Sequence, residues 1–287
     1  MRGLIALAVL LPSLYGPLYA QDELKRARSL YDQTDYEKSL NLLREIPKPT
    51  ADVDALKGQD YFMLGEYKKA CESFEKAFAL EPSNSEYAHW LGRSFGRRAE
   101  TSSPLFAFGN ASKARQYFER SVALAPNNGD ALNDLFEFYL QAPGFLGGGY
   151  DKAERIAQRI GRLNQAEGHF AQAELAERRK QFDTAEEQLR RAIEAAPNQV
   201  GRVLDLAKYL AKHGRIDESE AAFARAEALA PNSPKVSFAR AHTYIEQKRN
   251  LDRAKDLLVK YLHSDLTPDD PPRTQAERLL KQVEGAS

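Results

Sequence analysis

The chain has 287 residues, of which 41 are basic and 41 are acidic. This balance excludes a typical nucleic-acid-binding protein, which needs a basic excess to meet phosphates, and it gives no reason to expect binding to an anionic membrane surface. The single cysteine, Cys71, excludes an intrachain disulfide and a cysteine-based zinc site.

The first twenty residues differ in kind from the rest and are typical of a secretory signal peptide. One positive charge, Arg2, precedes an apolar run over residues 3–11, and the small residue Ala20 stands before the polar Gln21. The apolar run is too short to span a bilayer comfortably. The sequence therefore predicts a signal peptide at 1–20, export to the periplasm or secretion, and no membrane span after cleavage.

A repeated pattern occupies the rest of the chain. In four places a large apolar residue is followed three positions later by a small residue and eight positions later by proline. These large residues are Phe74, Phe118, Leu189 and Phe223. The spacing predicts pairs of amphipathic helices, in which small residues allow backbones to approach and proline ends the second helix. A single pair cannot bury its apolar face, so the pairs must stack.

The pattern resembles the tetratricopeptide repeat. The segment from residue 51 carries the defining residues of that family in order, and they are Gly58, Tyr61, Ala70, Phe74, Ala77 and Pro82. The resemblance implies an all-α superhelical solenoid of about seven helix-turn-helix repeats with a C-terminal capping helix. We expect the solenoid over 21–265 and a linker with the capping helix over 266–287. The repeats are expected near 20–50, 51–84, 85–128, 129–165, 166–199, 200–233 and 234–265.

Two repeats are longer than the others. The small residues that mark successive repeats are spaced by 31, 44, 39, 32, 34 and 35 positions, in the series Ser39, Ala70, Ala114, Ala153, Ala185, Ser219 and Ala254. The long spacings indicate insertions within 100–112 and 142–150, each between the two helices of its repeat. We expect two loops that lie side by side, because their repeats are neighbours. Their apolar side chains either pack as a structural collar or form a binding site, and they are Leu105, Phe106, Phe108, Phe145, Leu146 and Tyr150.

The resemblance also implies a concave groove lined by the first helix of each repeat. The residues at the matching positions are Arg28, Tyr31, Gln59, Phe62, His89, Arg93, Asn133, Glu137, Phe170, Glu174, Lys208, Phe238 and His242. This mixture of aromatic, polar and charged groups suits an extended or helical peptide better than a phosphate-rich ligand. The lysine and asparagine set that some family members use to clamp a C-terminal carboxylate is missing from the matching positions.

The sequence motifs that suggest catalysis or metal binding lack the structural context or the partner residues that they need. Residues 92–96 fit the G-x-S-x-G pattern with Ser94 at the nucleophile position, but that motif needs a sharp strand-to-helix turn and here lies within a predicted helix. The five histidines form neither an i, i+4 pair nor an H-E-x-x-H motif. We therefore expect no enzyme activity, no catalytic residue, no metal and no cofactor.

Together these features predict a protein–protein interaction scaffold that holds a protein or peptide partner outside the cytoplasm. The alternatives are a non-catalytic subunit or assembly factor of an envelope enzyme complex, and a hydrolase that uses Ser94. Self-association is a further alternative, because the ends of a solenoid can stack. The sequence leaves open whether the groove or the insertions contact the partner.

Overall fold

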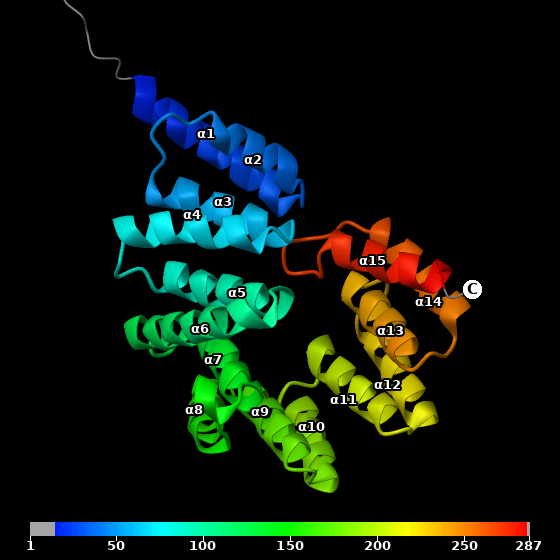
Figure 1. Ribbon diagram of the computed structural model, residues 1–287. Coiled ribbons are helices and arrows are strands. Elements are labelled where there is room, and N and C mark those ends of the chain that lie inside the picture. Colours follow the sequence, from blue (N-terminus) through cyan, green and yellow to red (C-terminus); the bar gives the residue numbers. More distant parts are fainter. Residues whose placement is uncertain (1–14, 286–287) are drawn as a thin grey trace, which may run out of the picture.

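The computed structural model describes residues 15–285, so residues 1–14 of the predicted signal peptide lie outside the described residues. Within 15–285 the chain forms fifteen α-helices, one short 3-10 helix and no strand. The helices pair as hairpins that stack into a curved array (Figure 1). In this range, no helix combines the length and apolar character needed to cross a membrane. The predicted all-α solenoid is confirmed.

Seven helical hairpins follow one another along the chain. Their first helices are α1 (Tyr15–Asp32), α3 (Ala51–Met63), α5 (Ser85–Thr101), α7 (Gly129–Gln141), α9 (Gln165–Arg178), α11 (Val200–Lys212) and α13 (Pro234–Glu246). Their second helices are α2 (Tyr36–Arg44), α4 (Tyr67–Leu80), α6 (Pro104–Leu124), α8 (Tyr150–Leu163), α10 (Phe182–Ala195), α12 (Ile216–Leu229) and α14 (Leu251–Leu262). The last helix, α15 (Arg273–Glu284), packs on α13 and α14 and buries Ala276, Leu279 and Val283, as a capping helix should.

The core of the array follows the repeat pattern. All seven small residues of the repeat series, from Ser39 to Ala254, are 0% exposed. The large residues Phe74 and Phe118 stand four positions after the small residues Ala70 and Ala114. Their rings fill the space between the second helix and the first helix of the same hairpin. A Cβ placed on Gly58 would come within 2.7 Å of the Phe74 ring, and one on Gly92 within 2.4 Å of the Phe118 ring. Glycine is therefore required at both positions, because the ring occupies the space of a side chain.

Several first helices begin at a side-chain cap. Asn84 accepts hydrogen bonds from the backbone N–H groups of Glu86 and Tyr87, and Asn128 accepts one from Ala131. These asparagines satisfy N–H groups that have no partner within the helix. The starts of these helices are thus fixed locally, whereas α11 and α13 begin without a side-chain cap.

The first insertion is helical, so the expectation of a loop was wrong. Only Ser102 and Ser103 separate α5 from α6, and the inserted residues lengthen both helices of the hairpin. Pro104 opens α6, where its missing N–H has no intrahelical partner to lose. The buried Asn110 amide donates to Ser102 Oγ at 3.1 Å, and Ser102 Oγ donates to the Arg98 carbonyl at 2.6 Å. These bonds tie the start of α6 to the end of α5.

The second insertion is a compact turn around the 3-10 helix η1 (Gly144–Leu146). The N–H of Gly148 donates to the Pro143 carbonyl, and the N–H of Gly149 donates to the Tyr139 carbonyl at 2.8 Å. Gly147 and Gly149 have φ values of +91° and +145°, which disfavour residues with a side chain. The glycine run therefore forms a hydrogen-bonded structure with a defined shape.

The two ends of the array curve toward each other (Figure 1). Tyr36, at the start of α2, is buried, and burial raises the pKa of its hydroxyl. The hydroxyl of Tyr261 in α14 and the guanidinium of Arg273 in α15 are near enough to act electrostatically on the same group. The first and last repeats are thus neighbours in space although they are far apart in the sequence.

Candidate functional site

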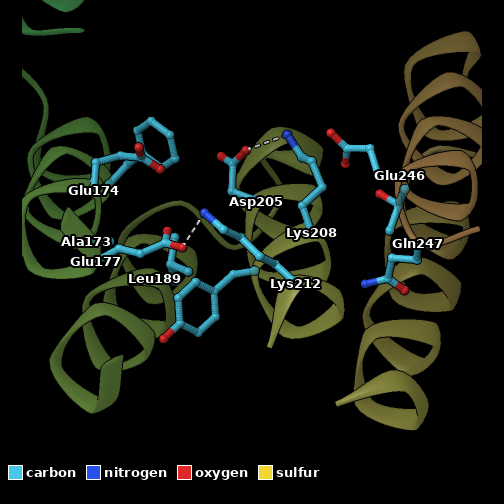
Figure 2. A pocket seen from close by; sticks show the side chains of 12 residues that line it. Ala173, Glu174, Glu177, Leu189, Asp205, Lys208, Lys212, Glu246 and Gln247 are labelled. Atoms are coloured by element: carbon cyan, nitrogen blue, oxygen red, sulfur yellow. Dashed lines mark hydrogen bonds and ion pairs between the residues drawn. The ribbon is translucent and has the colours of Figure 1, made fainter. Parts of the chain in front are cut away.

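A pocket of about 520 Å³ lies between the first helices α9, α11 and α13, where the groove was predicted (Figure 2). Its floor includes apolar groups, and its walls carry charged side chains that point into the space. The lining residues are Phe170, Ala173, Glu174, Glu177, Leu189, Asp205, Lys208, Tyr209, Lys212, Thr243, Glu246 and Gln247. We call it the first groove pocket.

The charges in the first groove pocket are incompletely paired. Lys208 Nζ lies 3.0 Å from Asp205 Oδ1, and Lys212 Nζ lies 2.7 Å from Glu177 Oε1. Glu174, on the α9 wall beside these pairs, has no ion-pair or hydrogen-bond partner for its carboxylate among the described residues. Four carboxylates and two ammonium groups line the pocket, so it is acidic in a chain that has no net charge.

The environment of Glu174 disfavours its charged form. Burial raises the pKa of its carboxyl, and the nearby carboxylates of Glu177 and Asp205 raise it further. The carboxylate of Glu137, one repeat earlier, acts in the same direction. A cation bound beside Glu174 would reverse these effects, because an opposite charge stabilises the ionised carboxylate.

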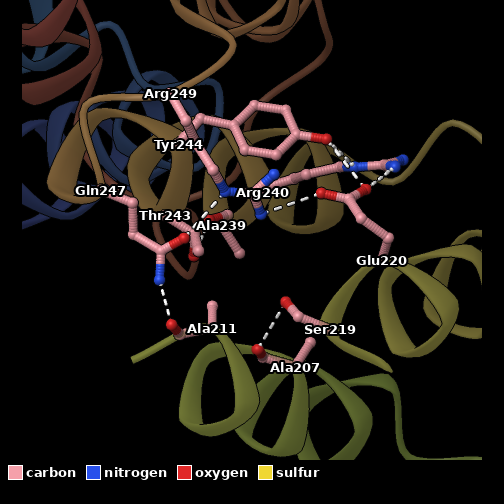
Figure 3. A network of polar contacts seen from close by, with 10 residues as sticks. All are labelled: Ala207, Ala211, Ser219, Glu220, Ala239, Arg240, Thr243, Tyr244, Gln247 and Arg249. Atoms are coloured by element: carbon pink, nitrogen blue, oxygen red, sulfur yellow. Dashed lines mark hydrogen bonds and ion pairs between the residues drawn. The ribbon is translucent and has the colours of Figure 1, made fainter. Parts of the chain in front are cut away.

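A polar network holds the α13 wall of this pocket in place (Figure 3). The Gln247 amide donates to the carbonyl of Ala211 at the end of α11, and it accepts from Arg249 Nε at 2.8 Å. Arg249 in turn pairs with Glu220 at 3.0 Å, and the buried Arg240 also pairs with Glu220. The network joins α11, α12 and α13, and it sets the position of Gln247 at the pocket rim.

A second groove pocket, of about 360 Å³, lies between α5, α6 and α7. It is more aromatic than the first. Arg93 lies 5.1 Å from the Phe62 ring centroid and 4.3 Å from the Trp90 centroid, where the cation is attracted to the ring faces. The lining residues are Phe62, Arg93, Gly96, Arg97, Ala99, Glu100, Ala111, Phe118, Asp134, Glu137, Phe138, Gln141, Ala142 and Leu146.

Glu137 stands at the wall of the second groove pocket, and its carboxylate is near enough to Glu174 of the first pocket to act on it electrostatically. Its carboxylate accepts a hydrogen bond from the Gln141 amide at 2.8 Å and has no ion-pair partner among residues 15–285. The enclosing walls of the groove raise the pKa of the Glu137 carboxyl, and the Asp134 carboxylate raises it further. Glu137 and Glu174 are thus two carboxylates on neighbouring first helices that have no ion-pair partner among the described residues, and the more distant Arg178 and Lys212 offset their raised pKa values only in part.

Six of the thirteen predicted groove residues line the two groove pockets. Phe62, Arg93 and Glu137 line the second, and Phe170, Glu174 and Lys208 line the first. Asn133 instead lines a separate hollow of about 220 Å³ beside the end of α8.

The other predicted groove residues contribute to the scaffold. Four of them are buried, and they are Tyr31, Gln59, His89 and Phe238. Arg28 is exposed and donates to the Gln59 amide oxygen at 2.7 Å, and His242 stacks on Phe238. His89 Nε2 lies 2.7 Å from Asp134 Oδ2, so it joins α5 to α7.

Several pocket residues were missing from the predicted set. Asp134, Asp205, Lys212 and Glu246 each lie one residue, or one helical turn, from a predicted position. They belong to the same helix faces because residues three and four apart are neighbours on a helix. Extending the predicted positions by this rule would have found them.

The insertions place six apolar side chains on one edge of the array, and we call these six the insertion patch: Leu105, Phe106, Phe108, Phe145, Leu146 and Tyr150. The rings of Phe108 and Phe145 stack with centroids 5.9 Å apart and planes 5° apart, which confirms that the insertions lie side by side. Leu105 is 82% exposed, Phe106 65% and Phe145 75%, so the patch is largely uncovered. Leu146 is half-buried and also lines the second groove pocket.

The structure gives the G-x-S-x-G motif a packing role. Ser94 lies within α5 and is 0% exposed, so its hydroxyl cannot reach a substrate. In residues 15–285, no three histidine, cysteine or acidic side chains are grouped as ligands of a metal ion.

Comparison with known proteins agrees with this architecture. Residues 55–84 and 176–237 each match the tetratricopeptide repeat family. A comparison with curated proteins finds no match.

Solved structures of tetratricopeptide repeat proteins share the fold. One from Parabacteroides merdae has 16% identity and a TM-score of 0.59, with 93% of this chain and 99% of that chain covered. A thermophilic one from Thermus thermophilus has 21% identity and a TM-score of 0.53, with 67% and 98% covered. The paired helices, the buried small residues and the two matching segments together show that the chain is a tetratricopeptide repeat protein.

Proposed function

We propose that this protein is an interaction scaffold outside the cytoplasm, and that its groove binds an extended segment of a partner protein through lysine or arginine side chains. Tetratricopeptide repeats generally mediate protein–protein interaction. The observation that carries the proposal is Glu174, a partly buried carboxylate without an ion-pair partner among the described residues, at the wall of the first groove pocket.

Charge complementarity supports a basic partner. The first groove pocket holds two more carboxylates than ammonium groups, and Glu137 adds another unpaired carboxylate one repeat away. A guanidinium can donate two parallel hydrogen bonds to a carboxylate, and such pairs are strong where water is excluded. An arginine side chain placed between Glu137 and Glu174 would relieve the repulsion between their charges.

The apolar surfaces in the groove support a peptide rather than a free ion. Phe170 and Leu189 line the first groove pocket, and Phe62, Phe118 and Phe138 line the second. Aromatic and aliphatic surface gives binding energy through burial, while the charged groups fix orientation. An extended chain can use both pockets because they lie on successive first helices.

The extracytoplasmic location rests on the N-terminal sequence. A positive charge, a short apolar run and a small residue before Gln21 are the features of an export signal. A groove that binds through burial and charge needs neither a nucleotide nor a reducing environment, so it can operate after export.

The test is binding to an array of 12-residue peptides in which the numbers of arginine, glutamate and leucine residues vary independently. We expect binding that increases with arginine content and is absent for glutamate-rich peptides. Glu174→Gln should weaken binding of the best arginine peptide roughly tenfold or more, because a charge-assisted hydrogen bond is lost.

Glu187→Gln is the matched control, because Glu187 is exposed on the second helix α10 and pairs with Arg191. It should leave affinity unchanged. Equal binding of arginine-rich and glutamate-rich peptides, or equal affinity of the Glu174→Gln and Glu187→Gln variants, would contradict the proposal.

A further inference from the structure

The insertion patch is presented rigidly. A Cβ on Gly148 would lie 1.8 Å from the Ala142 carbonyl oxygen, so the turn is closed too tightly for any other residue. Lys152 Nζ donates to the Gly147 carbonyl at 2.8 Å, and Arg115 of α6 packs against Gly147. Together with the stacked rings, these contacts hold η1 against α6. Exposed aromatic groups that are held in place bind with little loss of side-chain entropy.

Charge is nearly absent from the inserted segments. Residues 102–114 contain one charged residue, Lys113, and residues 142–150 contain none, in a chain that is 29% charged. The exposed rings of Phe108 and Phe145 stack, and Leu105 and Phe106 lie on the same turn of α6 as Phe108; an exposed apolar cluster of this kind marks an interaction site. The chemistry of the partner that covers the insertion patch follows from the residues around the patch.

The insertion patch is continuous with the groove. Leu146 belongs to the patch and lines the second groove pocket, together with Ala142 from the same turn and Ala111 from the extended part of α6. The same pocket contains Glu137, whose carboxylate acts electrostatically on Glu174 in the first groove pocket. A path therefore leads from the acidic groove, past Leu146, to the exposed rings of Phe108 and Phe145.

We propose that the insertion patch binds the apolar end of the same partner segment whose basic residues occupy the groove. This inference rests on the proposed function, and it defines the partner segment as bipartite: a run with arginine or lysine, followed or preceded by aromatic or aliphatic residues. The groove and the insertions are then one site.

Two other occupants fit the surroundings less well. A two-fold contact with a second copy through the patch would bring the Glu137 carboxylate of each copy toward the same interface, at a cost in like-charge repulsion. A lipid surface would place that carboxylate beside anionic headgroups, which repel it. A basic peptide gains from the same carboxylate.

The experiment is a selection of 16-residue peptides from a random phage-displayed library, with the whole exported protein as the immobilised target. We expect the selected peptides to carry a basic cluster beside an apolar cluster. A synthetic peptide of the selected consensus should bind the Phe108→Ser, Phe145→Ser double variant at least tenfold more weakly. A truncated peptide with only the basic cluster should bind this variant and the unaltered protein equally.

Phe182→Ser is the matched control, because Phe182 is a 45% exposed aromatic residue on the same edge, at the start of α10. It should leave the affinity of the consensus peptide unchanged. Circular dichroism of each variant should match that of the unaltered protein. The rings of Phe108 and Phe145 are more than half exposed, so their replacement should leave the helical fold intact.

The outcomes separate this inference from the proposed function. If basic peptides are selected without an apolar cluster, or if the double variant binds the consensus peptide normally, the inference fails and the groove proposal stands. If no basic peptide is selected, the proposed function fails.

Two physical assays test the other occupants. Flotation with phosphatidylcholine vesicles that the double variant loses would assign the patch to lipid, and light scattering that shows a dimer disrupted by the double variant would assign it to self-association. Either result would overturn the inference.

Discussion

Ser39 Oγ donates a hydrogen bond to Asp60 Oδ2 at 2.7 Å, and both side chains are 0% exposed. The other carboxyl oxygen, Oδ1, is buried without a hydrogen-bond partner. Ser39 occupies the small-residue position of the first repeat, so this contact lies at the crossing of α2 and α3. A buried acid with one unpaired oxygen should make stability depend on pH.

The Asp60→Asn variant should remove that dependence. Burial raises the pKa of Asp60 to about 8 from an ordinary value of 3.8. Between about pH 4 and pH 8 the folded protein keeps a proton that the unfolded chain has released, so the free energy of unfolding falls as pH rises. Asparagine is neutral and can still accept from Ser39, so the variant should be about 2–4 kcal/mol more stable at pH 7.5.

Urea denaturation of both proteins at pH 5, 6, 7 and 8 measures this effect. The difference in unfolding free energy should grow with pH across the series. Parallel pH profiles would show that Asp60 is ionised in the folded protein already at pH 5.

Gly168→Ala should destabilise the crossing of α8 and α9. A Cβ at this position would lie 2.3 Å from the Cα of Gly161, which is backbone and cannot rotate away. The two helices would have to separate, at a cost of about 1–3 kcal/mol. Gly201→Ala is the control, because Gly201 lies in α11 with nothing within 4 Å of the added Cβ. Thermal unfolding should show a lower midpoint for Gly168→Ala alone.

Glu220→Gln should weaken the network that joins α11, α12 and α13. The side chain of Arg240 is 9% exposed, and its remaining partners would be the Tyr244 hydroxyl at 2.8 Å and Glu227 at 3.6 Å. Loss of the main partner of a buried guanidinium should cost about 2–4 kcal/mol. Glu218→Gln, on the same helix but 51% exposed, should have a much smaller effect because its ion pair is screened by water. Equal denaturation midpoints for the two variants would contradict the assignment.

The exported protein should begin at Gln21. Cleavage after Ala20 would leave residues 21–32 of α1 attached to the first repeat. Mass spectrometry of the exported protein measures the mature N-terminus, and replacing Ala20 by the large residue tryptophan should leave the full-length precursor. A full-length protein found in the cytoplasmic fraction would exclude the signal peptide.

The repeat register could be predicted from the sequence because the residues that define it pack within one hairpin or against the next. Ala70 and Phe74 lie on one helix, and their partner Gly58 is in the adjacent helix of the same hairpin. Such local contacts leave a regular spacing that can be read without a structure.

The fine structure of the groove could not be predicted in the same way. His89 Nε2 lies 2.7 Å from Asp134 of the next repeat, and this contact depends on how much each repeat rotates against the next, which no single repeat encodes. Phe238 packs instead on Tyr261 in the second helix of its own hairpin. The helical form of residues 104–111 was missed because a short apolar segment after proline is compatible with either a loop or a helix.

The approach of Tyr36 to Tyr261 and Arg273 affects how the array can come apart. An open stack of repeats frays from its free ends, one hairpin at a time. Here the two end hairpins lie close enough to interact electrostatically, so we expect that loosening of one end changes the surroundings of the other, and that the terminal hairpins lose protection from hydrogen exchange together. We likewise expect that a partner which needs a wider groove moves the two ends of the solenoid apart.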